Sequence, residues 1–283
     1  MTANVASLVI SNLSLRWSSP LIFNDPFDVP RELIPGVNAQ ELVEAVARRH
    51  AALIEQPPDD TSSLTPKLQS LIDSVKNGIT NDHRSALIAS LREAAKAIET
   101  KNSSLEEFRQ MWRESLPDLR ILCLTDSPSH LAMWYHYAES YTGVVLEFAC
   151  NDILDSAWLA AQPVTYPEEK PEVYTLNGLA ELMTTKTEIA VKKLLHVSTY
   201  TKAPDWSYER EWRIVTFKRP TNFGLFTDYR FDPRELATIF LGPLISSEDK
   251  FKLKALAAQY PHVRVVEVSL GLSRELVFNE IPG

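Results

Sequence analysis

This chain of 283 residues lacks cysteine pairs, glycine-rich loops and net positive charge, and each absence excludes a class of protein. Cys123 and Cys150 are its only cysteines, too few for a disulfide framework or a cysteine-based metal site, so a reduced, cytoplasmic setting is expected. Eight glycines stand against 18 prolines. Neither G-x-G-x-x-G nor G-x-x-x-x-G-K occurs, so we expect no Rossmann or Walker phosphate loop.

The net charge and the hydropathy pattern exclude two more classes. A net charge of −8 argues against a general nucleic-acid groove and against a broad surface for anionic membranes. No run reaches the ~18 apolar residues of a membrane helix, and residues 1–11 lack the basic region and apolar core of a secretory signal. An apolar fraction of 45% is ordinary for a globular protein. The length of 283 residues suffices for one large domain, with or without a sizeable insertion, and we expect one domain over residues 1–283.

Apolar periodicity predicts where helices and strands lie. Asn38 and Glu41 have the spacing of a capping box and open a block of roughly four helices at about residues 37–116. A short helix to about residue 10 and a strand at 13–17 precede this block. Further strands are expected at 120–125, 144–149, 164–166, 238–241, 263–268 and 276–278, and further helices at 129–137, 179–196 and 246–260. The fold class is therefore α+β: a mixed, mostly antiparallel sheet with a helical insertion after the first strand region and a small βαβ-like end.

Residues 206–215 (W-S-Y-E-R-E-W-R-I-V) alternate in polarity, which predicts one extended strand. Glu209, Glu211 and Arg213 would share a face, with the Cα atoms of the two glutamates roughly 6.5–7 Å apart. Two such carboxylates can repel, raise a pKa, or hold a cation or a positively charged transition state. Taken alone, the stretch slightly favours the simpler alternative, a solvated strand face with cross-strand ion pairs.

Two other stretches carry candidate binding residues. Asn24-Asp25-Pro26 is a sequence that strongly favours a turn. A purely structural turn and a functional turn are equally good interpretations. Trp134, His136 and Tyr137 lie on a short expected helix, with Trp134 and Tyr137 on one face. Such aromatic pairs belong more often to a core, although they also stack on flat ligands.

Several spaced pieces of the chain follow one pattern: L-R-W-S-S-P-L-I-F-N-D-P-F-D at 15–28, C-L-T at 123–125, M-W-Y-H-Y-A at 133–138, residues 143–148, V-T-Y at 164–166, Lys202 with W-S-Y-E-R-E-W-R at 206–213, and I-F-L-G at 239–242. Together they resemble the bacterial DUF2971 family, whose name records an unknown function. The resemblance spans most of the chain outside the helical block. Members usually begin with a tyrosine-rich strand, and this chain starts at or after that point, so a functional residue carried there would be missing.

The order of these pieces, with a glutamate strand late in the chain, is also similar to a distant version of the ADP-ribosyltransferase fold. That resemblance implies an enzyme of bacterial stress, toxin or anti-phage systems with NAD as its substrate. Glu209 or Glu211 would be the catalytic carboxylate, which stabilises the oxocarbenium ion formed as nicotinamide leaves. Arg16 or Arg213 would contact the phosphates, Ser18 and Ser19 would support the site, and Trp134 and Tyr137 would stack. The remaining binding candidates are Asn24, Asp25, His136 and Lys202.

Two other functions stay open, and no resident metal or cofactor is assigned. In a metal-dependent phosphodiesterase or nuclease, Mg²⁺ would be bound by Asp25, Asp28, Glu209 and Glu211. In a non-catalytic interaction scaffold, Arg213 would pair with Asp25 or Asp28, and Lys202 with Glu209. Carboxylates saturated by arginine and lysine would favour the scaffold, whereas an open pocket between them and the Trp134 helix would favour a nucleotide-like ligand. Protein partners are undefined.

Overall fold

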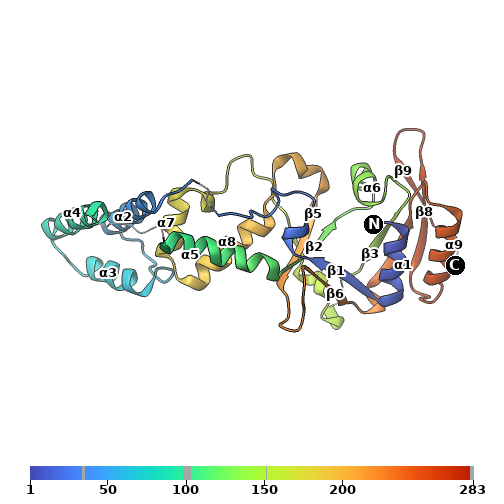
Figure 1. Ribbon diagram of the computed structural model, residues 1–283, viewed down its shortest axis with the longest axis horizontal. Coiled ribbons are helices and arrows are strands. Elements are labelled where there is room, and N and C mark those ends of the chain that lie inside the picture. Colours follow the sequence, from blue (N-terminus) through green and yellow to red (C-terminus); the bar gives the residue numbers. More distant parts are fainter. Residues whose placement is uncertain (34–35, 98–102, 151, 281–283) are drawn as a thin grey trace. The chain divides into compact units, whose positions relative to one another are not determined.

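The computed structural model describes residues 1–33, 36–97, 103–150 and 152–280, and its contacts group the chain into two compact units (Figure 1). Unit 1 comprises residues 1–24, 117–166 and 202–283, and unit 2 comprises residues 25–116 and 167–201. The helical block expected at about 37–116 falls within unit 2. Among the described residues, no helix combines the length and the apolar character that crossing a membrane requires.

Unit 1 is built on two β-sheets, which together with the helices confirm the α+β class. The first sheet is antiparallel throughout and has the order β4-β5-β2-β1-β6. Its strands are β1 (Ser14–Ser18), β2 (Leu119–Thr125), β4 (Gln162–Pro163), β5 (Glu211–Phe217) and β6 (Phe226–Arg230). The second sheet has the order β3-β7-β8-β9, with β3 (Val144–Phe148), β7 (Leu236–Leu241), β8 (Arg264–Leu270) and β9 (Leu276–Glu280).

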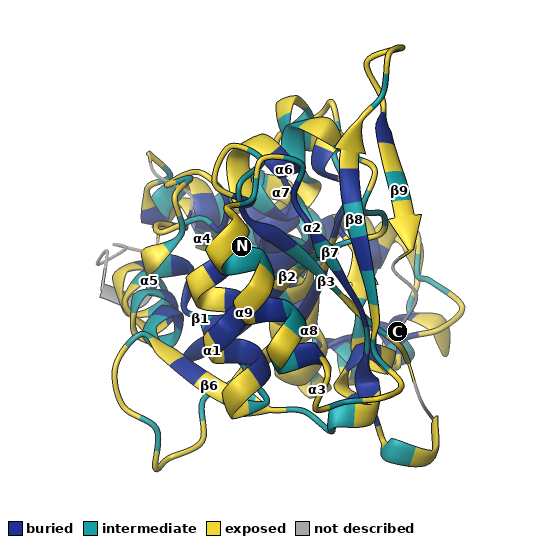
Figure 2. Cartoon of the chain, turned by 90° about the vertical axis from the view of Figure 1, so that its right-hand side faces the viewer, coloured by how far each residue is buried: buried dark blue, intermediate teal, exposed yellow. Residues whose placement is uncertain are grey.

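Helices cover both faces of the second sheet. The parallel strands β7 and β8 are joined by α9 (Ser247–Ala257), which is the predicted βαβ-like end. Figure 2 shows α9 beside α1 (Ala3–Asn12) in front of this sheet, where small residues such as Ala6 and Ala257 allow close packing on Ile239. On the opposite face, Trp134 of α6 (Leu131–Tyr137) packs against Val268.

Unit 2 is helical, with α2 (Ala39–Glu55), α3 (Pro66–Lys76), α4 (Asn81–Ala97), α5 (Ser103–Ser115), α7 (Leu176–Thr184) and α8 (Thr187–Tyr200). The predicted capping box of Asn38 and Glu41 is present at the start of α2. The single helix expected at 179–196 is wrong, because α7 and α8 are separate. Thr185 is extended there and forms a β-bridge with Leu64, which takes the backbone out of the helical conformation.

The expectation of one strand over residues 206–215 is also wrong for its first half. Pro204 begins a 3₁₀ helix, η6 (Pro204–Glu209), since its fixed φ suits the first position of a helical turn. Arg210 then adopts a left-handed conformation with φ 45°, and β5 starts at Glu211. Trp206 and Tyr208 therefore lie on no strand face, whereas Glu211 and the residues after it follow the predicted strand.

Two smaller boundaries differ from the sequence-based expectation. The helix expected at 129–137 begins later, because α6 starts at Leu131 with His130 as its N-cap, and the hydroxyl of Ser129 hydrogen-bonds to that of Ser127. The edge strand expected at 164–166 is shorter and earlier, because β4 contains only Gln162 and Pro163. Neither difference moves a candidate site residue to another element.

Candidate functional site

Four charged side chains of unit 1 are buried together where η6 meets β5, and we call them the charge cluster. Their exposed fractions are 8% for Lys202, 1% for Glu209, 4% for Glu211 and 0% for Arg213. Burying charges is costly unless each one is paired and hydrogen-bonded. Their contacts therefore decide what this cluster can do.

Lys202 lies between the two carboxylates. Its Nζ donates to Glu209 Oε2 over 2.5 Å and to Glu211 Oε2 over 3.3 Å. The same ammonium lies 4.6 Å from the ring centre of Trp206, within range of a cation–π interaction. One lysine thus links the end of η6 to the start of β5.

Arg213 holds Glu211 in a two-point contact. Arg213 Nε donates to Glu211 Oε1 over 2.7 Å, and Nη2 donates to Oε2 over 2.9 Å. This parallel geometry is the strongest arrangement for an arginine and a carboxylate. The guanidinium also lies 5.8 Å from the ring centre of Phe23.

Tyrosine and threonine hydroxyls complete the cluster. Tyr137 donates to Glu209 Oε1 over 2.6 Å, so each of the four carboxylate oxygens accepts at least one hydrogen bond. Thr125 Oγ1 donates to the Glu209 carbonyl over 3.0 Å, and the Tyr166 hydroxyl accepts the Glu211 N–H over 2.9 Å. Both glutamates are therefore fixed through backbone and side chain.

The protonation states follow from these contacts. Burial raises the pKa of Glu211, but the hydrogen bonds and charge of Arg213 and the charge of Lys202 outweigh it, so the pKa lies below its ordinary value. Burial, followed by the hydrogen bond to Glu209, raises the pKa of Tyr137, whose phenol stays protonated. With Glu211 ionised, the lysine and the arginine have the carboxylates as their counter-charges.

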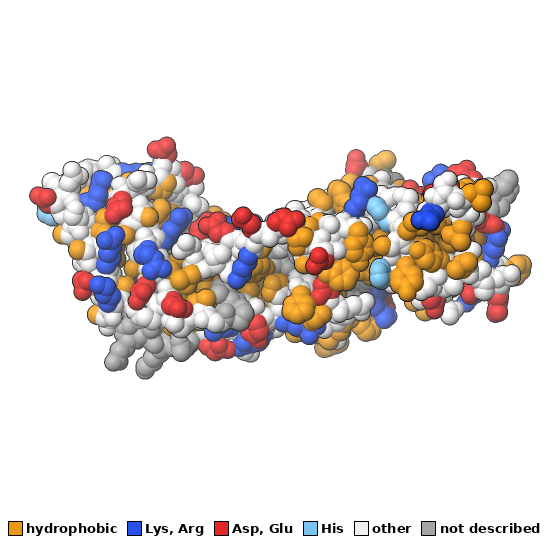
Figure 3. Space-filling model, turned by 90° about the horizontal axis from the view of Figure 1, so that it is seen from above, with side chains coloured by type: hydrophobic (Ala, Val, Ile, Leu, Met, Phe, Trp, Pro, Cys, Tyr) orange, Lys and Arg blue, Asp and Glu red, His pale blue; other side chains and the backbone are white. Residues whose placement is uncertain are grey.

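A chain of neighbouring aromatic rings lies beside the cluster, and we call it the aromatic row. Successive ring centres are 6.2, 5.3, 6.2 and 6.1 Å apart in the order Tyr141, Tyr135, His136, Tyr208 and Trp206. Tyr135 is 55% exposed and Tyr208 38%. In the right-hand half of the view in Figure 3, hydrophobic side chains gather around histidine side chains.

The early-strand candidates lie apart from the cluster. Arg16 forms an exposed two-point ion pair with Asp228, at 2.9 and 3.1 Å, and its guanidinium lies 3.8 Å from the centre of the Phe226 ring. Ser18 lies opposite Ile121 in the β1–β2 register. Ser19 is fully buried, and its hydroxyl accepts the Leu21 N–H at the start of a 3₁₀ turn.

The other candidates are divided between the two units. Asp25 belongs to unit 2, where its carboxylate accepts the Phe27 N–H in the expected turn, while Asn24 is the exposed last residue of the first stretch of unit 1. Trp134 and Tyr137, predicted to share a face, lie three residues apart on α6 but differ in burial. Trp134 is 1% exposed and donates to the Pro128 carbonyl, whereas Tyr137 is 44% exposed, because only the inner side of this short helix meets the sheet.

Three residues of the site were absent from the sequence-based candidates: Thr125, Tyr166 and Cys123. Cys123 is exposed, lies opposite Arg213 in the β2–β5 register, and its thiol hydrogen-bonds to Glu211. Strand alternation would have placed Cys123 and Thr125 on one face, but it does not show which strand pairs with β5. Tyr166 belongs to the V-T-Y piece at 164–166, but that piece gives no sign of the contact with Glu211.

The described part of the chain contains no group of three or more histidine, cysteine, aspartate or glutamate side chains that could hold a metal ion. Asp25 and Asp28 belong to unit 2, and Glu209 and Glu211 belong to unit 1.

Comparison with known proteins identifies one family. Residues 133–214 match the family described as "Protein of unknown function (DUF2971)", which confirms the resemblance over that segment. The matched segment contains Tyr137 and the whole charge cluster. No curated protein and no solved structure matches this chain, and the resemblance to ADP-ribosyltransferases stays a prediction.

Proposed function

We propose that this chain, with its DUF2971 segment, is a non-catalytic interaction module in which the charge cluster is structural. One observation carries the proposal: all four carboxylate oxygens of Glu209 and Glu211 are already engaged by Lys202, Arg213 and Tyr137. The predicted pair of Lys202 with Glu209 is among these contacts. A saturated carboxylate pair was the sequence-based criterion for a scaffold.

The balance of charge supports this interpretation. A carboxylate stabilises an oxocarbenium ion only to the extent that its negative charge is not already compensated. Each close pair here contributes on the order of 5 kcal/mol of attraction before desolvation, with an effective dielectric constant of about 20. Freeing Glu211 for a reaction would forfeit much of that attraction and leave Arg213 buried without its two-point partner.

The cluster would serve to hold the aromatic row in place. Tyr137, on the same helix as Tyr135 and His136, binds Glu209, and Trp206 lies against Lys202. Exposed tyrosines on a rigid support are typical of protein interaction surfaces, because they bury much area with little loss of side-chain entropy. We therefore propose the aromatic row as the contact surface for a protein partner.

A titration of NAD and of Mg²⁺, with an assay of nicotinamide release, tests the proposal on wild-type protein and Glu211→Gln. We expect neither ligand to bind at the cluster, no nicotinamide release, and a lower unfolding temperature for the variant. Glu147→Gln is the matched control, since Glu147 makes only an exposed ion pair at 3.4 Å to Arg264. Nicotinamide release that disappears in Glu211→Gln without loss of stability would refute the structural role.

ADP-ribosyl transfer from NAD is the second candidate, and one observation favours it. Glu211 opens β5, β5 pairs with β2, and β2 pairs with β1. The register runs from Ser18 through Ile121 to Val215, so Ser18 and Glu211 lie on the same face of the first sheet. Arg16 shares that face by alternation, which is the arrangement that the resemblance implies for an arginine, a serine and a catalytic glutamate.

A further inference from the structure

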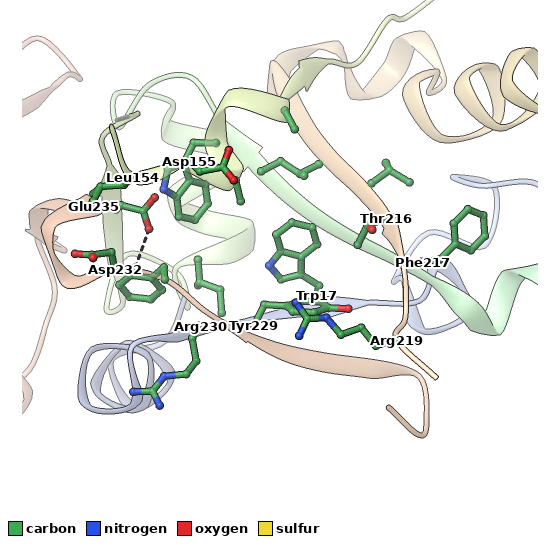
Figure 4. Close-up of a pocket in the computed structure, with 17 residues that line it drawn as sticks. Trp17, Leu154, Asp155, Thr216, Phe217, Arg219, Tyr229, Arg230, Asp232 and Glu235 are labelled. Carbon is green, nitrogen blue, oxygen red and sulfur yellow. Dashed lines mark hydrogen bonds between the residues drawn. The ribbon is translucent and has the colours of Figure 1, made fainter. Parts of the chain in front are cut away.

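A cavity of about 550 Å³ lies on the first sheet of unit 1, and its lining contains none of the four residues of the charge cluster. Its wall includes Trp17 and Ile214 (Figure 4). Ile214 is three residues after Glu211 on β5, so their side chains lie on opposite faces of the sheet. The volume falls within the range of small-molecule sites.

Aromatic rings form much of the wall of this cavity. Trp17 and Tyr229 meet edge to face with ring centres 5.2 Å apart, and Trp158 stacks on Phe148 at 4.5 Å. Three of these rings, those of Trp17, Tyr229 and Trp158, line the cavity itself. Rings held by other rings form a preformed surface that suits a flat, aromatic guest.

Trp158 brings a polar group that has no partner among the described residues. The residue is only 7% exposed, and its Nε1 has no hydrogen-bond acceptor among the residues that the structure describes. A buried donor without an acceptor is destabilising, and few such groups occur in native proteins. An acceptor atom on a molecule in the cavity would satisfy it.

Arg219 provides a positive charge at the cavity. Within the described ranges, no ion pair or hydrogen bond engages its guanidinium, and Figure 4 shows its side chain running toward the cavity near Trp17. Arg230, also in the lining, points away. The acidic lining residues lie on the left in Figure 4, away from Arg219 on the right. Asp232 is bound by Arg234, Glu235 accepts the Asp232 N–H, and Asp155 is exposed.

We propose that this cavity binds a nucleoside monophosphate. The base would lie among the rings of Trp17, Tyr229 and Trp158, and a ring nitrogen or carbonyl would accept from Trp158 Nε1. The phosphate would bind Arg219, which suits it better than a lysine would because guanidinium matches phosphate geometry. An exocyclic amino group on the base would face the acidic end. This site is separate from the charge cluster and independent of the proposed interaction surface.

Isothermal titration of the full chain with adenosine monophosphate, adenosine and ribose 5-phosphate tests the proposal. We expect saturable binding of one adenosine monophosphate, and weaker binding of the two fragments. Arg219→Gln should weaken it about tenfold or more, the loss expected for one charge-assisted hydrogen bond. Trp158→Phe, which keeps an aromatic ring against Phe148 and removes the N–H, should weaken it about fivefold.

Two variants serve as matched controls. Arg274→Gln removes an exposed arginine in the turn between β8 and β9, and Trp212→Phe removes an indole of β5, and neither residue lines the cavity. Both should bind adenosine monophosphate as wild type does. The proposal is overturned if adenosine monophosphate does not bind saturably, if adenosine binds equally well, or if either Arg219→Gln or Trp158→Phe binds like the controls.

Discussion

Lys202 is the residue on which the charge cluster depends most, since its ammonium pairs with both carboxylates. Arg213 neutralises Glu211, and Tyr137 can offer Glu209 a hydrogen bond but no positive charge. Without the lysine, Glu209 would be a buried carboxylate next to another carboxylate. A buried charge that lacks its partner is costly.

Lys202→Met should therefore destabilise the protein by about 3–5 kcal/mol, the usual cost of removing one partner of a buried ion pair. Urea denaturation followed by tryptophan fluorescence measures this. Lys193→Met is the control, because Lys193 pairs with Glu181 at the surface, where such pairs contribute about 0–1 kcal/mol. Equal losses in both variants would show that the cluster contributes no more than a surface pair.

Acid should weaken the folded state through Glu211. Its pKa lies below the ordinary value of 4.5 when folded, so the unfolded chain binds more protons at acidic pH. The stabilisation is complete above pH 4.5 and is lost as pH falls through the folded pKa. Urea midpoints over a pH series should fall less steeply on acidification for Glu211→Gln than for wild type. Parallel pH profiles would contradict the assigned pKa shift.

At the scale of elements, the junction of β3 and β7 depends on two glycines. The Gly242 N–H donates to the Gly143 carbonyl over 3.0 Å. A Cβ on Gly242 would lie 2.4 Å from the Tyr141 carbonyl oxygen and 2.5 Å from that of Gly143. Those are backbone atoms of the turn that leads from α6 into β3, so they cannot rotate away as a side chain would.

Gly242→Ala should consequently lower the free energy of unfolding by about 3 kcal/mol, at the upper end of overpacking effects. Gly271→Ala is the matched control in the same sheet, because its Cβ would meet only the flexible side chain of Glu275. We expect that variant to lose about 0.5 kcal/mol, as an ordinary surface substitution does. Thermal unfolding measures the stability of both variants. Similar losses of stability would show that the backbone of the turn at residues 141–143 can shift at little cost.

Elements with a strong local signal were predictable from the sequence, and those decided by distant contacts were not. The capping box at Asn38 is local chemistry, and its helix was found. The break between α7 and α8 depends on the bridge from Thr185 to Leu64, which lies far away in the sequence. Over residues 204–210, the alternation in polarity predicted a strand, but Pro204 begins a 3₁₀ helix and the left-handed conformation of Arg210 ends it.

The site was predictable in the same partial way. Glu209, Glu211 and Arg213 stood out because charges alternate within one short stretch, and Lys202 was paired correctly with Glu209. The bond from Tyr137 to Glu209 joins residues 72 positions apart, and no periodicity reveals such a pairing. The division into two sheets was missed for the same reason, because alternation shows the faces of a strand but not its neighbours.

At the scale of the whole molecule, the net charge of −8 sets which partners are attracted from a distance. We expect no measurable binding of a short DNA duplex at about 0.15 M salt, since such binding depends on cations that neutralise phosphates. Fluorescence anisotropy of a labelled duplex over a salt series checks this. Binding that weakens linearly with the logarithm of salt concentration would reveal a local basic groove.

The place of β1 in the first sheet bears on how the chain folds. Its neighbours are β2 and β6, and the ion pair between β1 and β6 joins residues 212 positions apart. Contacts so distant in sequence close large loops before they gain any stabilisation, which makes folding slow. During synthesis, β1 gains its neighbour β6 only after residues 226–230 have been made, and until then Trp17 and Leu15 are not covered by all of their final neighbours. Slow folding and a need for chaperones would then follow from the pairing of β1, which is early in the sequence, with β6, which is late.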